Sequence, residues 1–437
     1  MDKNRLKSLP SYLKNMGIAI VYPSVLSGRL TPPPSNEMAI RHLWAACLGA
    51  GGAIGNCPAT DDVRAILKLA TQFGADIKFS HHVADILSPG LPFPTSPLTC
   101  YSNSRASRLA VPLAMLFGTS TSITGAKIPD SALAQIDSYA MQLDLRITKT
   151  SNELSVQGPP TNDWLELKNR EGLYWASGFM MAFPLAKFEM KIFMDDFVAS
   201  HPSTKLTINT LELFGIGYQF DEDAGALTIA AEQQYPPIYS DIENDYKTGS
   251  YFLGALAMAG DGQVILPKDS LQPQRNFWKI FEEAKILTFS PEGSEAQINS
   301  SYPLPLEKEI DIRHYPSLLP LAAVLATQSS HKITKIGPLF PVSPKTLARA
   351  KLISTALNAL GANSHIQDSY LYVHASSLKG ASVDCGYDGR VAMALALAGL
   401  VAKGKTSISG AEAASRICRN FWSDLKSVGA KISFANK

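Results

Sequence analysis

The stretch "ISTALNALGANSHI" at residues 353–366 begins with the pattern of one secondary structure and ends with that of another. Apolar residues recur at three and four positions in its first half, as on one face of a helix, and alternate in its second half, as in a strand. Gly361 stands at the junction. Glycine ends a helix in a left-handed conformation without steric cost, so the stretch predicts a helix, a tight turn and a strand.

The same pattern recurs along the whole chain. The other copies are "ILKLATQFGADIKF" (66–79), "IDSYAMQLDLRITK" (136–149), "INTLELFGIGYQF" (208–220), "FWKIFEEAKILTF" (277–289) and "FWSDLKSVGAKISF" (421–434). Glycine stands at the junction in four of the six copies, and successive junctions lie about 70 residues apart. Such even self-similarity is typical of repeated architectural units. Six α/β units therefore fill the chain.

The six copies divide into three and three. The break lies near "AAEQQYPPIYSD" (230–241), a polar, proline-rich segment that is typical of a linker. A second proline-rich segment, "LSGRLTPPPS" (26–35), is then the other crossing, since prolines stiffen a connector. Ser35 is expected to cap a helix that starts at Asn36. The predicted lobes are residues 29–233, and residues 1–28 together with 234–437, joined near residues 28 and 235.

Composition excludes several classes of protein. The chain has 437 residues, 46% of them hydrophobic, and a net charge of +2, so no nucleic-acid partner is expected. The most apolar run, "VAMALALAGLVAKG" (391–404), is too short to cross a membrane and predicts a buried helix. Five cysteines without CxxC spacing indicate reduced, mostly buried thiols in a cytoplasmic protein. No metal-ligand spacing or glycine-rich nucleotide loop is present, so neither a metal nor a cofactor is expected.

Five segments carry a resemblance to a known family. They are "PPPSNEMAIRHLWAACLGAGGAIGNCPATDDVRAILKLATQFGA" (32–75), "NSRASRLAVPLAMLF…ITGAKIPDS" (103–131), "ENDYKTGSYFLGALAMAG" (243–260), "SPKTLARAKLISTALNALGA" (343–362) and "VDCGYDGRVAMALALAGLVA" (383–402). They resemble signatures of the enolpyruvyl transferases, specifically of EPSP synthase (3-phosphoshikimate 1-carboxyvinyltransferase), over essentially the full chain. The resemblance implies an α/β fold, a two-domain inside-out α/β barrel with three βαβαββ units in each domain and the active site in the cleft.

The resemblance also implies a chemistry. The family moves the enolpyruvyl group of phosphoenolpyruvate onto a sugar-like hydroxyl, so the expected partner is a small anion: phosphoenolpyruvate, or a phosphorylated or carboxylated cyclic compound. Arginines, lysines and helix N-termini match such anions. The residues that the resemblance assigns to anion or substrate binding are Ser35, Asn36, Arg41, Asn103, Arg105, Lys345, Arg349, Arg390 and Arg416.

The chain departs from the family where protons are transferred. Where the family signatures carry a lysine, an aspartate, a glutamate and a histidine, this chain has Asn36, Ser317, Thr346 and Gly389. The acceptor-binding triplet falls at Gly172, Leu173 and Tyr174, and the small-residue loop contains Arg105. Proton transfer requires positioned groups of suitable pKa. The remaining candidates for it are Asp388, His314, Lys345 and Glu37, with Tyr246 and Lys247 close to family site positions.

Alternatives stay open at this point. Arg41 either faces an anion site or is a solvated surface arginine, and each surviving arginine could instead be structural, pairing with Asp388 or Glu412. Three functions fit the pattern. They are an enolpyruvyl transferase with a changed acceptor, an enzyme of another reaction type on the same scaffold, and a catalytically inactive binding homologue. Standard 3-phosphoshikimate activity is not expected, because the proton-transfer groups are missing.

Overall fold

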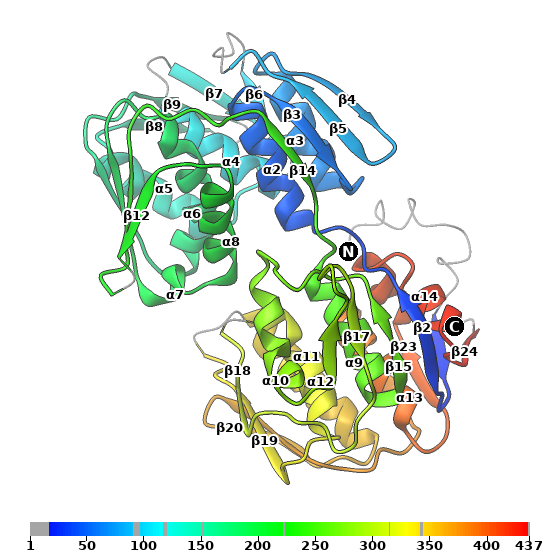
Figure 1. The fold of residues 1–437 in the computed structure, drawn as a ribbon. Coiled ribbons are helices and arrows are strands. Elements are labelled where there is room, and N and C mark those ends of the chain that lie inside the picture. Colours follow the sequence, from blue (N-terminus) through cyan, green and yellow to red (C-terminus); the bar gives the residue numbers. More distant parts are fainter. Residues whose placement is uncertain are drawn as a thin grey trace. The chain divides into compact units, whose positions relative to one another are not determined.

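The computed structural model describes residues 17–90, 97–116, 120–150, 153–221, 223–313, 315–340 and 344–435. The described chain forms two compact units (Figure 1). The first unit contains the described residues up to Pro33 and those from Asn244 onward, and the second unit is Pro34–Glu243. Each unit contains three of the six four-stranded sheets.

One connectivity is common to all six sheets. In the sheet of β10 (Trp164–Leu167), β11 (Met190–Met194), β12 (Tyr218–Asp221) and β13 (Ala226–Ile229), the first strand is parallel to the second. The second strand is antiparallel to the fourth, which is antiparallel to the third. Helix α6 (Asn169–Ala182) joins β10 to β11, and α8 (Pro202–Leu213) leads toward β12 after the short α7 (Asp196–Ala199). This is a βαβαββ unit, as the resemblance to the enolpyruvyl transferases implies.

The second unit holds two more copies. One comprises β6 (Leu98–Thr99), α4 (Ser104–Ala114), β7 (Ser120–Thr124), α5 (Asp130–Gln142), β8 (Arg146–Lys149) and β9 (Glu153–Gln157). The other comprises β14 (Ile238–Asp241), α2 (Asn36–Leu48), β3 (Gly52–Gly55), α3 (Asp61–Thr71), β4 (Asp76–Ser80) and β5 (Val83–Leu87). In this last copy the strand that pairs in parallel with β3 comes from the far end of the unit.

The first unit holds the remaining three copies. A continuous copy comprises β18 (Glu309–Asp311), α11 (Leu319–Ala326), β19 (Ile333–Gly337), α12 (Pro344–Ala359), β20 (Ser364–Gln367) and β21 (Tyr370–His374). The second comprises β2 (Leu26–Leu30), α9 (Tyr246–Ala259), β15 (Gly260–Val264), α10 (Lys279–Glu283), β16 (Leu287–Phe289) and β17 (Ala296–Ile298). The third comprises β22 (Ser382–Asp384), α13 (Gly389–Val401), β23 (Thr406–Ser409), α14 (Phe421–Ser427), β24 (Ile432–Ala435) and, from the start of the described chain, β1 (Ile18–Val21).

The two crossings lie slightly later in the chain than the sequence analysis places them. Because β2 pairs with β15, it belongs to the first unit, and an expected boundary at residue 28 falls inside this strand. The chain crosses at its prolines instead. The Ser35 amide donates to the Glu243 carbonyl, and the Asp245 amide donates to the Pro33 carbonyl, each at 2.8 Å. The two connecting segments therefore run side by side.

The helix–strand junctions share one backbone conformation. Gly74, Gly215 and Gly361 have φ of 85°, 68° and 84°, and Gly429 has φ of 108°. The two copies without glycine place Asp144 and Lys285 there, with φ of 56° and 57°. All six turns are therefore left-handed, including the two that contain an ordinary side chain.

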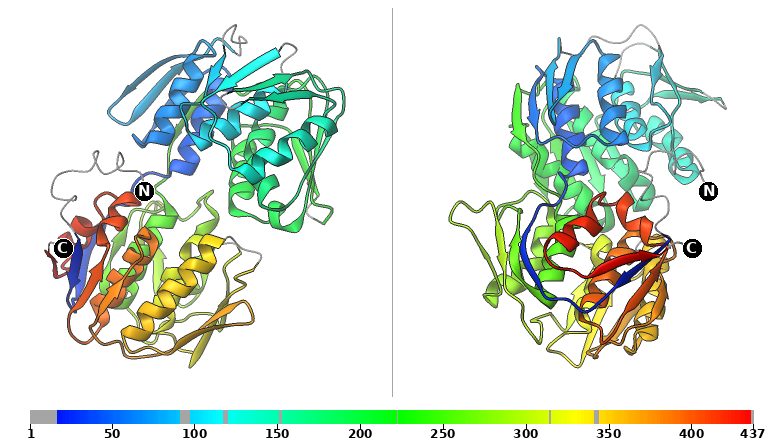
Figure 2. Two further views of the ribbon diagram at one scale, coloured as in Figure 1. Left: turned by 180° about the vertical axis from the view of Figure 1, so that it is seen from behind. Right: turned by 90° about the vertical axis from the view of Figure 1, so that its right-hand side faces the viewer.

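Helices form the interior of each unit, and sheets form its outer layer (Figure 2). In the first unit α9, α11 and α13 contact one another, and every residue of α13 from Gly389 to Leu400 is buried. A helix that is apolar on all sides belongs in a core, which confirms the buried helix expected at residues 391–404. The strands instead bury alternate residues, as in β9. Among the described residues, no helix is both long and apolar enough to span a membrane.

Candidate functional site

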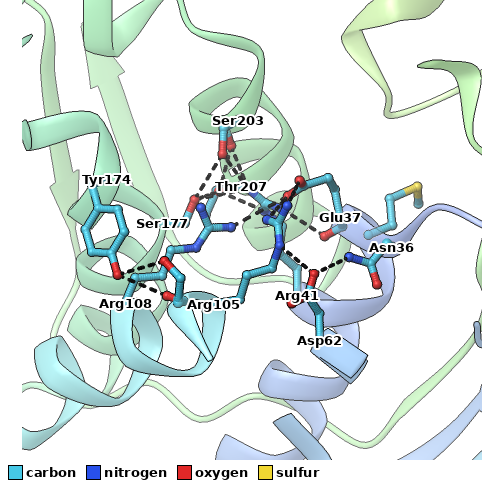
Figure 3. Close-up of polar contacts among 12 residues, drawn as sticks. Asn36, Glu37, Arg41, Asp62, Arg105, Arg108, Tyr174, Ser177, Ser203 and Thr207 are labelled. Carbon is cyan, nitrogen blue, oxygen red and sulfur yellow. Dashed lines mark hydrogen bonds and ion pairs between the residues drawn. The ribbon is translucent and has the colours of Figure 1, made fainter. Parts of the chain in front are cut away.

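Polar and charged side chains from five helices converge in the second unit. They come from α2, α3, α4, α6 and α8, and those of α2, α3 and α4 lie in the first two turns of their helices (Figure 3). Helix N-termini carry free N–H groups and a partial positive charge, so they favour anions. We define the second-unit cluster as Glu37, Arg41, Asp62, Arg105 and Arg108 with the polar side chains that contact them.

Arg41 lies at the centre of the second-unit cluster and is only 1% exposed. Its Nε donates to Thr207 Oγ1 at 2.9 Å, and its Nη2 donates to Ser203 Oγ at 2.8 Å and to Ser177 Oγ at 3.0 Å. Its Nη1 donates to the carbonyl of Glu37 at 2.8 Å. Burial lowers the pKa of Arg41, and the Glu37 carboxylate acts against this shift. The solvated-arginine alternative is therefore wrong, and each guanidinium nitrogen already has a protein acceptor.

The Glu37 carboxylate is shared by three arginines. Arg105 contacts it with both terminal nitrogens, at 2.6 Å for Nη2–Oε1 and 2.8 Å for Nη1–Oε2. Arg41 Nη1 lies 3.3 Å from Oε2, and Arg108 Nη2 lies 3.6 Å from the same oxygen. Both oxygens of Glu37 are thus occupied by arginine nitrogens. This environment does not suit Glu37 for the proton-transfer role that the sequence analysis considers.

A second carboxylate, Asp62, fixes the other side of Arg105. Its Oδ2 accepts from Arg105 Nε at 2.9 Å and from Asn36 Nδ2 at 3.0 Å, and its Oδ1 accepts from Asn103 Nδ2 at 2.9 Å. Burial alone would lower the pKa of Arg105, but Glu37 and Asp62 outweigh burial and raise it. Arg105 is therefore held as a cation between two carboxylates.

Arg108 is the least well paired member of the second-unit cluster. Its side chain is 15% exposed, and its Nε is buried with no hydrogen-bond partner in the described part of the chain. Burial and the Arg105 charge lower the pKa of Arg108 to about 10, with a smaller contribution from Arg41, while Glu37 acts in the opposite direction. The second-unit cluster thus contains three arginines against two carboxylates.

The structure brings most of the expected second-unit residues together. Asn36, Arg41, Asn103 and Arg105 all contact the cluster, but Ser35 is fully buried and its hydroxyl accepts from the Met38 amide as a helix cap. The capping role agrees with the sequence analysis, and no contact of Ser35 in the described chain supports ligand binding.

Sequence reasoning missed several cluster members. They are Asp62, Arg108, Ser177, Ser203 and Thr207. A signal existed for Arg108, which follows Arg105 by three residues and so shares its helix face. The three hydroxyl residues gave no such signal, because they meet Arg41 only through tertiary packing.

A second group of charges, the first-unit cluster, comprises Lys345, Arg349, Asp388 and Arg390. Asp388 caps α13, and its Oδ1 accepts from the Arg390 amide at 2.9 Å. Its Oδ2 accepts from Arg349 Nε at 2.8 Å. This is the pairing that the sequence analysis raises as a structural alternative for Arg349. Both Asp388 oxygens are thus engaged in hydrogen bonds.

Two cations of the first-unit cluster keep donors available. Arg390 donates Nη1 to the Lys247 carbonyl at 2.9 Å and lies over the Tyr251 ring, 5.7 Å from its centroid. Lys345 is exposed and has no hydrogen bond or ion pair within the described chain. Partial burial lowers the pKa of Lys345, as do Arg349 and Arg390, while Asp388 opposes the shift. The first-unit cluster thus contains three cations and one carboxylate, a stronger positive excess than in the second-unit cluster.

The other expected residues of the first unit are less closely tied to this cluster. Arg416 is exposed at the end of the short helix η4 (Ala411–Arg416), which packs against α13, and it has no ion pair among the described residues. The Tyr246 hydroxyl donates to the Pro267 carbonyl at 2.6 Å, a structural contact. Lys247 contributes its backbone carbonyl to Arg390. His314 lies outside the described residues.

Among the described residues, no group of three or more His, Cys, Asp or Glu side chains is arranged to hold a metal ion. The guanidinium, ammonium and helix N-terminal groups of each cluster are those that bind anions and hydroxyls.

Comparisons with known proteins agree with this architecture. The 3-phosphoshikimate 1-carboxyvinyltransferase of Clostridium kluyveri is 26% identical over 423 residues, covering 94% of this chain and 97% of its own length. That of Dehalococcoides mccartyi is 27% identical, with coverage of 94% and 97%. The solved EPSP synthase of Acinetobacter baumannii superimposes with a TM-score of 0.77 at 16% identity, covering 95% of this chain and 99% of its own. The enolpyruvyl transferase NikO of Streptomyces tendae gives 0.71 at 13% identity, covering 97% of this chain and 100% of its own.

A family model that matches most of the chain shows which family the chain belongs to. The model described as EPSP synthase (3-phosphoshikimate 1-carboxyvinyltransferase) matches residues 20–425. This span includes both charge clusters and five of the six βαβαββ units in full, and it ends before β24 of the sixth. The chain therefore belongs to the EPSP synthase family and has its two-domain, inside-out α/β fold.

Proposed function

We propose that the protein is an EPSP-synthase-like transferase that binds an anionic small molecule, phosphoenolpyruvate, through the first-unit cluster, and that it lacks standard 3-phosphoshikimate activity. One observation carries the proposal: at the N-terminus of α13, Arg349 pairs with Asp388, and Lys345 lies within the electrostatic influence of Arg349, Arg390 and this one carboxylate. A phosphate or carboxylate group would balance the excess positive charge and accept hydrogen bonds from the Lys345 ammonium group. Arg416, on the helix that packs against α13, is a further candidate for contact with the anion.

The expected loss of standard activity has a chemical reason. Addition of the acceptor hydroxyl and elimination of phosphate both require groups that exchange protons near neutral pH. Glu37 and Asp388 are each already engaged in ion pairs with arginines, so neither carboxylate is available to a substrate hydroxyl. At the positions of the family's proton-transfer groups stand an amide, two hydroxyls and a glycine (Asn36, Ser317, Thr346 and Gly389).

Calorimetric titration with phosphoenolpyruvate tests the binding step. Lys345→Ala should weaken binding about tenfold or more, because a charge-assisted hydrogen bond contributes roughly 1.5–3 kcal/mol. Lys351→Ala is the matched control, since Lys351 is another exposed lysine on α12. Equal affinity of wild type and Lys345→Ala, or no binding to the wild type, would contradict the proposal.

A catalytically inactive binding protein is the second candidate. It is favoured by one observation, namely that Glu37 and Asp388 are both engaged in ion pairs. A single experiment distinguishes the transferase from the binding protein. A transferase releases phosphate from phosphoenolpyruvate in the presence of some hydroxyl acceptor, whereas a binding protein retains phosphoenolpyruvate intact with every acceptor offered.

A further inference from the structure

A carboxylate of the chain itself fills the arginine site of the second unit (Figure 3). Glu37 stands in the first turn of α2, and its two oxygens lie 2.6–3.6 Å from nitrogens of Arg41, Arg105 and Arg108. Three guanidinium groups beside helix N-termini are the arrangement that recognises a carboxylate or phosphate of a ligand. Here the ligand-like group is covalently part of the protein.

We propose that Glu37 is a specificity-determining residue that excludes an acidic group from this position. Its carboxylate takes the place of an acidic group of a ligand, so the second unit accepts a molecule that is uncharged at this position. Describing that molecule as the acceptor of a transfer reaction rests on the proposed function above. The exclusion of an anion does not rest on the proposed function, because it follows from the charges of the second-unit cluster.

The contacts leave little positive charge for an external anion. Every guanidinium nitrogen of Arg41 and Arg105 donates to or ion-pairs with a protein oxygen. Arg108 retains a buried Nε without a partner, but its Nη2 already lies 3.6 Å from Glu37. A phosphate placed here would face Glu37 and Asp62 at close range, and like charges so placed oppose binding strongly.

The polar groups around the cluster define the class of ligand that remains. Ser104 and Tyr174 are partly exposed and uncharged, and they present hydroxyl groups, while the nearby Asn103 amide is engaged with Asp62. The Tyr174 hydroxyl lies 3.1 Å from the carbonyl oxygens of both Ser104 and Lys127. Amides and hydroxyls recognise hydroxyls and amides of a ligand. The inferred class is an uncharged, polyhydroxylated or amide-bearing small molecule.

Removal of the Glu37 charge in the full-length protein tests the inference with sulfate as the probe. Glu37→Gln should lower the unfolding temperature, since three arginines lose their shared counterion, and sulfate should restore it. Sulfate should also bind at least about tenfold more tightly than to the wild type, with one additional equivalent, because the like charge is gone. Sodium chloride at equal ionic strength controls for general screening.

Asp61→Asn is the matched control variant. Asp61 also lies at a helix start of the second unit, and Asp61→Asn removes the same charge, but the side chain is 89% exposed and, among the described residues, ion-pairs only with Arg64. It should show neither the loss of stability nor the rescue by sulfate. If Glu37→Gln does not fold, the smaller Glu37→Ser is purified in sulfate and then titrated after its removal.

Two results would overturn the inference. The first is a Glu37→Gln protein that folds but binds sulfate no better than the wild type does. The second is a wild-type protein that binds one equivalent of sulfate, when this binding persists in Lys345→Ala and is lost in Arg108→Ala. Such a result would place an anion beside Glu37. Failure of the proposed function is distinguishable, because it appears as absent phosphoenolpyruvate binding in the wild type while the gain in Glu37→Gln persists.

Discussion

At the scale of single residues, Arg41 is a structural cation. Its guanidinium joins three helices by donating to Glu37 on its own helix α2, to Ser177 on α6 and to Thr207 on α8. We expect Arg41→Ala to lower the free energy of unfolding by about 3–5 kcal/mol, because removal of one partner leaves the other buried groups of an ionic network without their counterpart. Chemical denaturation measures this change.

A surface ion pair provides the comparison for Arg41. Arg64 pairs with Asp61 at 3.3 Å, and both side chains are more than half exposed. Arg64→Ala should therefore change the free energy of unfolding by less than about 1 kcal/mol. If Arg41→Ala were as mild as Arg64→Ala, the network would not be structural.

His42 makes the stability of the second unit sensitive to pH. Burial, with a smaller contribution from Arg41, lowers the pKa of His42 from 6.5 to about 4. Between these values the unfolded chain takes up a proton that the native state rejects, so stability should fall as pH falls from 6.5 toward 4. The loss reaches about 3 kcal/mol for this single group.

His42→Gln should flatten this part of the pH profile. Denaturant unfolding of wild type and variant between pH 7 and pH 4 measures the slope. His365→Gln, which replaces an exposed histidine, should retain the wild-type slope. Parallel profiles for wild type and His42→Gln would show that His42 is not the group responsible.

The sequence predicted which residues would gather at the site but not how they pair. The expected residues Asn36, Glu37, Arg41 and Arg105 do lie together, because helix starts converge in this fold. Glu37 could not be recognised as a counterion from sequence, since two of its three arginines lie on another helix. Such pairing depends on tertiary structure, which a local pattern does not encode.

At the scale of elements, the six left-handed junctions set the repeat. Gly215 has φ of 68° with nothing within 4 Å of an added Cβ, so a side chain there is opposed by backbone strain alone. Gly215→Ala should lower the free energy of unfolding by about 1–2 kcal/mol. Lys285 is exposed with φ of 57°, so its replacement by glycine should change the free energy of unfolding in the opposite direction.

Lys285→Gly is thus the reciprocal test. It should raise the free energy of unfolding by up to about 1 kcal/mol, because relief of strain is partly offset by the greater freedom of glycine in the unfolded chain. Denaturation of both variants measures the pair. A Gly215→Ala protein that is more stable than the wild type would show that this junction tolerates an ordinary residue.

Periodicity predicted the elements well because each repeat carries its own signal. The helix, the turn and the following strand of each copy are local in sequence, and all six appear in the structure. The strands β1, β2 and β14 carried no such signal of their partners. They complete sheets whose other strands lie far away in sequence, and such pairing follows from tertiary contact.

At the scale of the whole molecule, the division into two units follows from where those strands pair. The proline-rich segments did mark the crossings, but β2 and β14 extend into them, so the units divide after Pro33 and Glu243. Each unit carries one charge cluster near helix N-termini. The first-unit cluster has an excess of cations, whereas the second-unit cluster is largely neutralised by Glu37 and Asp62.

This asymmetry of charge leads to the most direct test of the account. The purified full-length protein is mixed with phosphoenolpyruvate and shikimate 3-phosphate, and phosphate release is measured, with the Acinetobacter baumannii EPSP synthase as positive control. The account predicts turnover far below the ordinary enzyme range, because Glu37 and Asp62 oppose a phosphorylated acceptor and no free acid–base group stands at the aligned positions. Turnover of about 1–10³ s⁻¹ would contradict it.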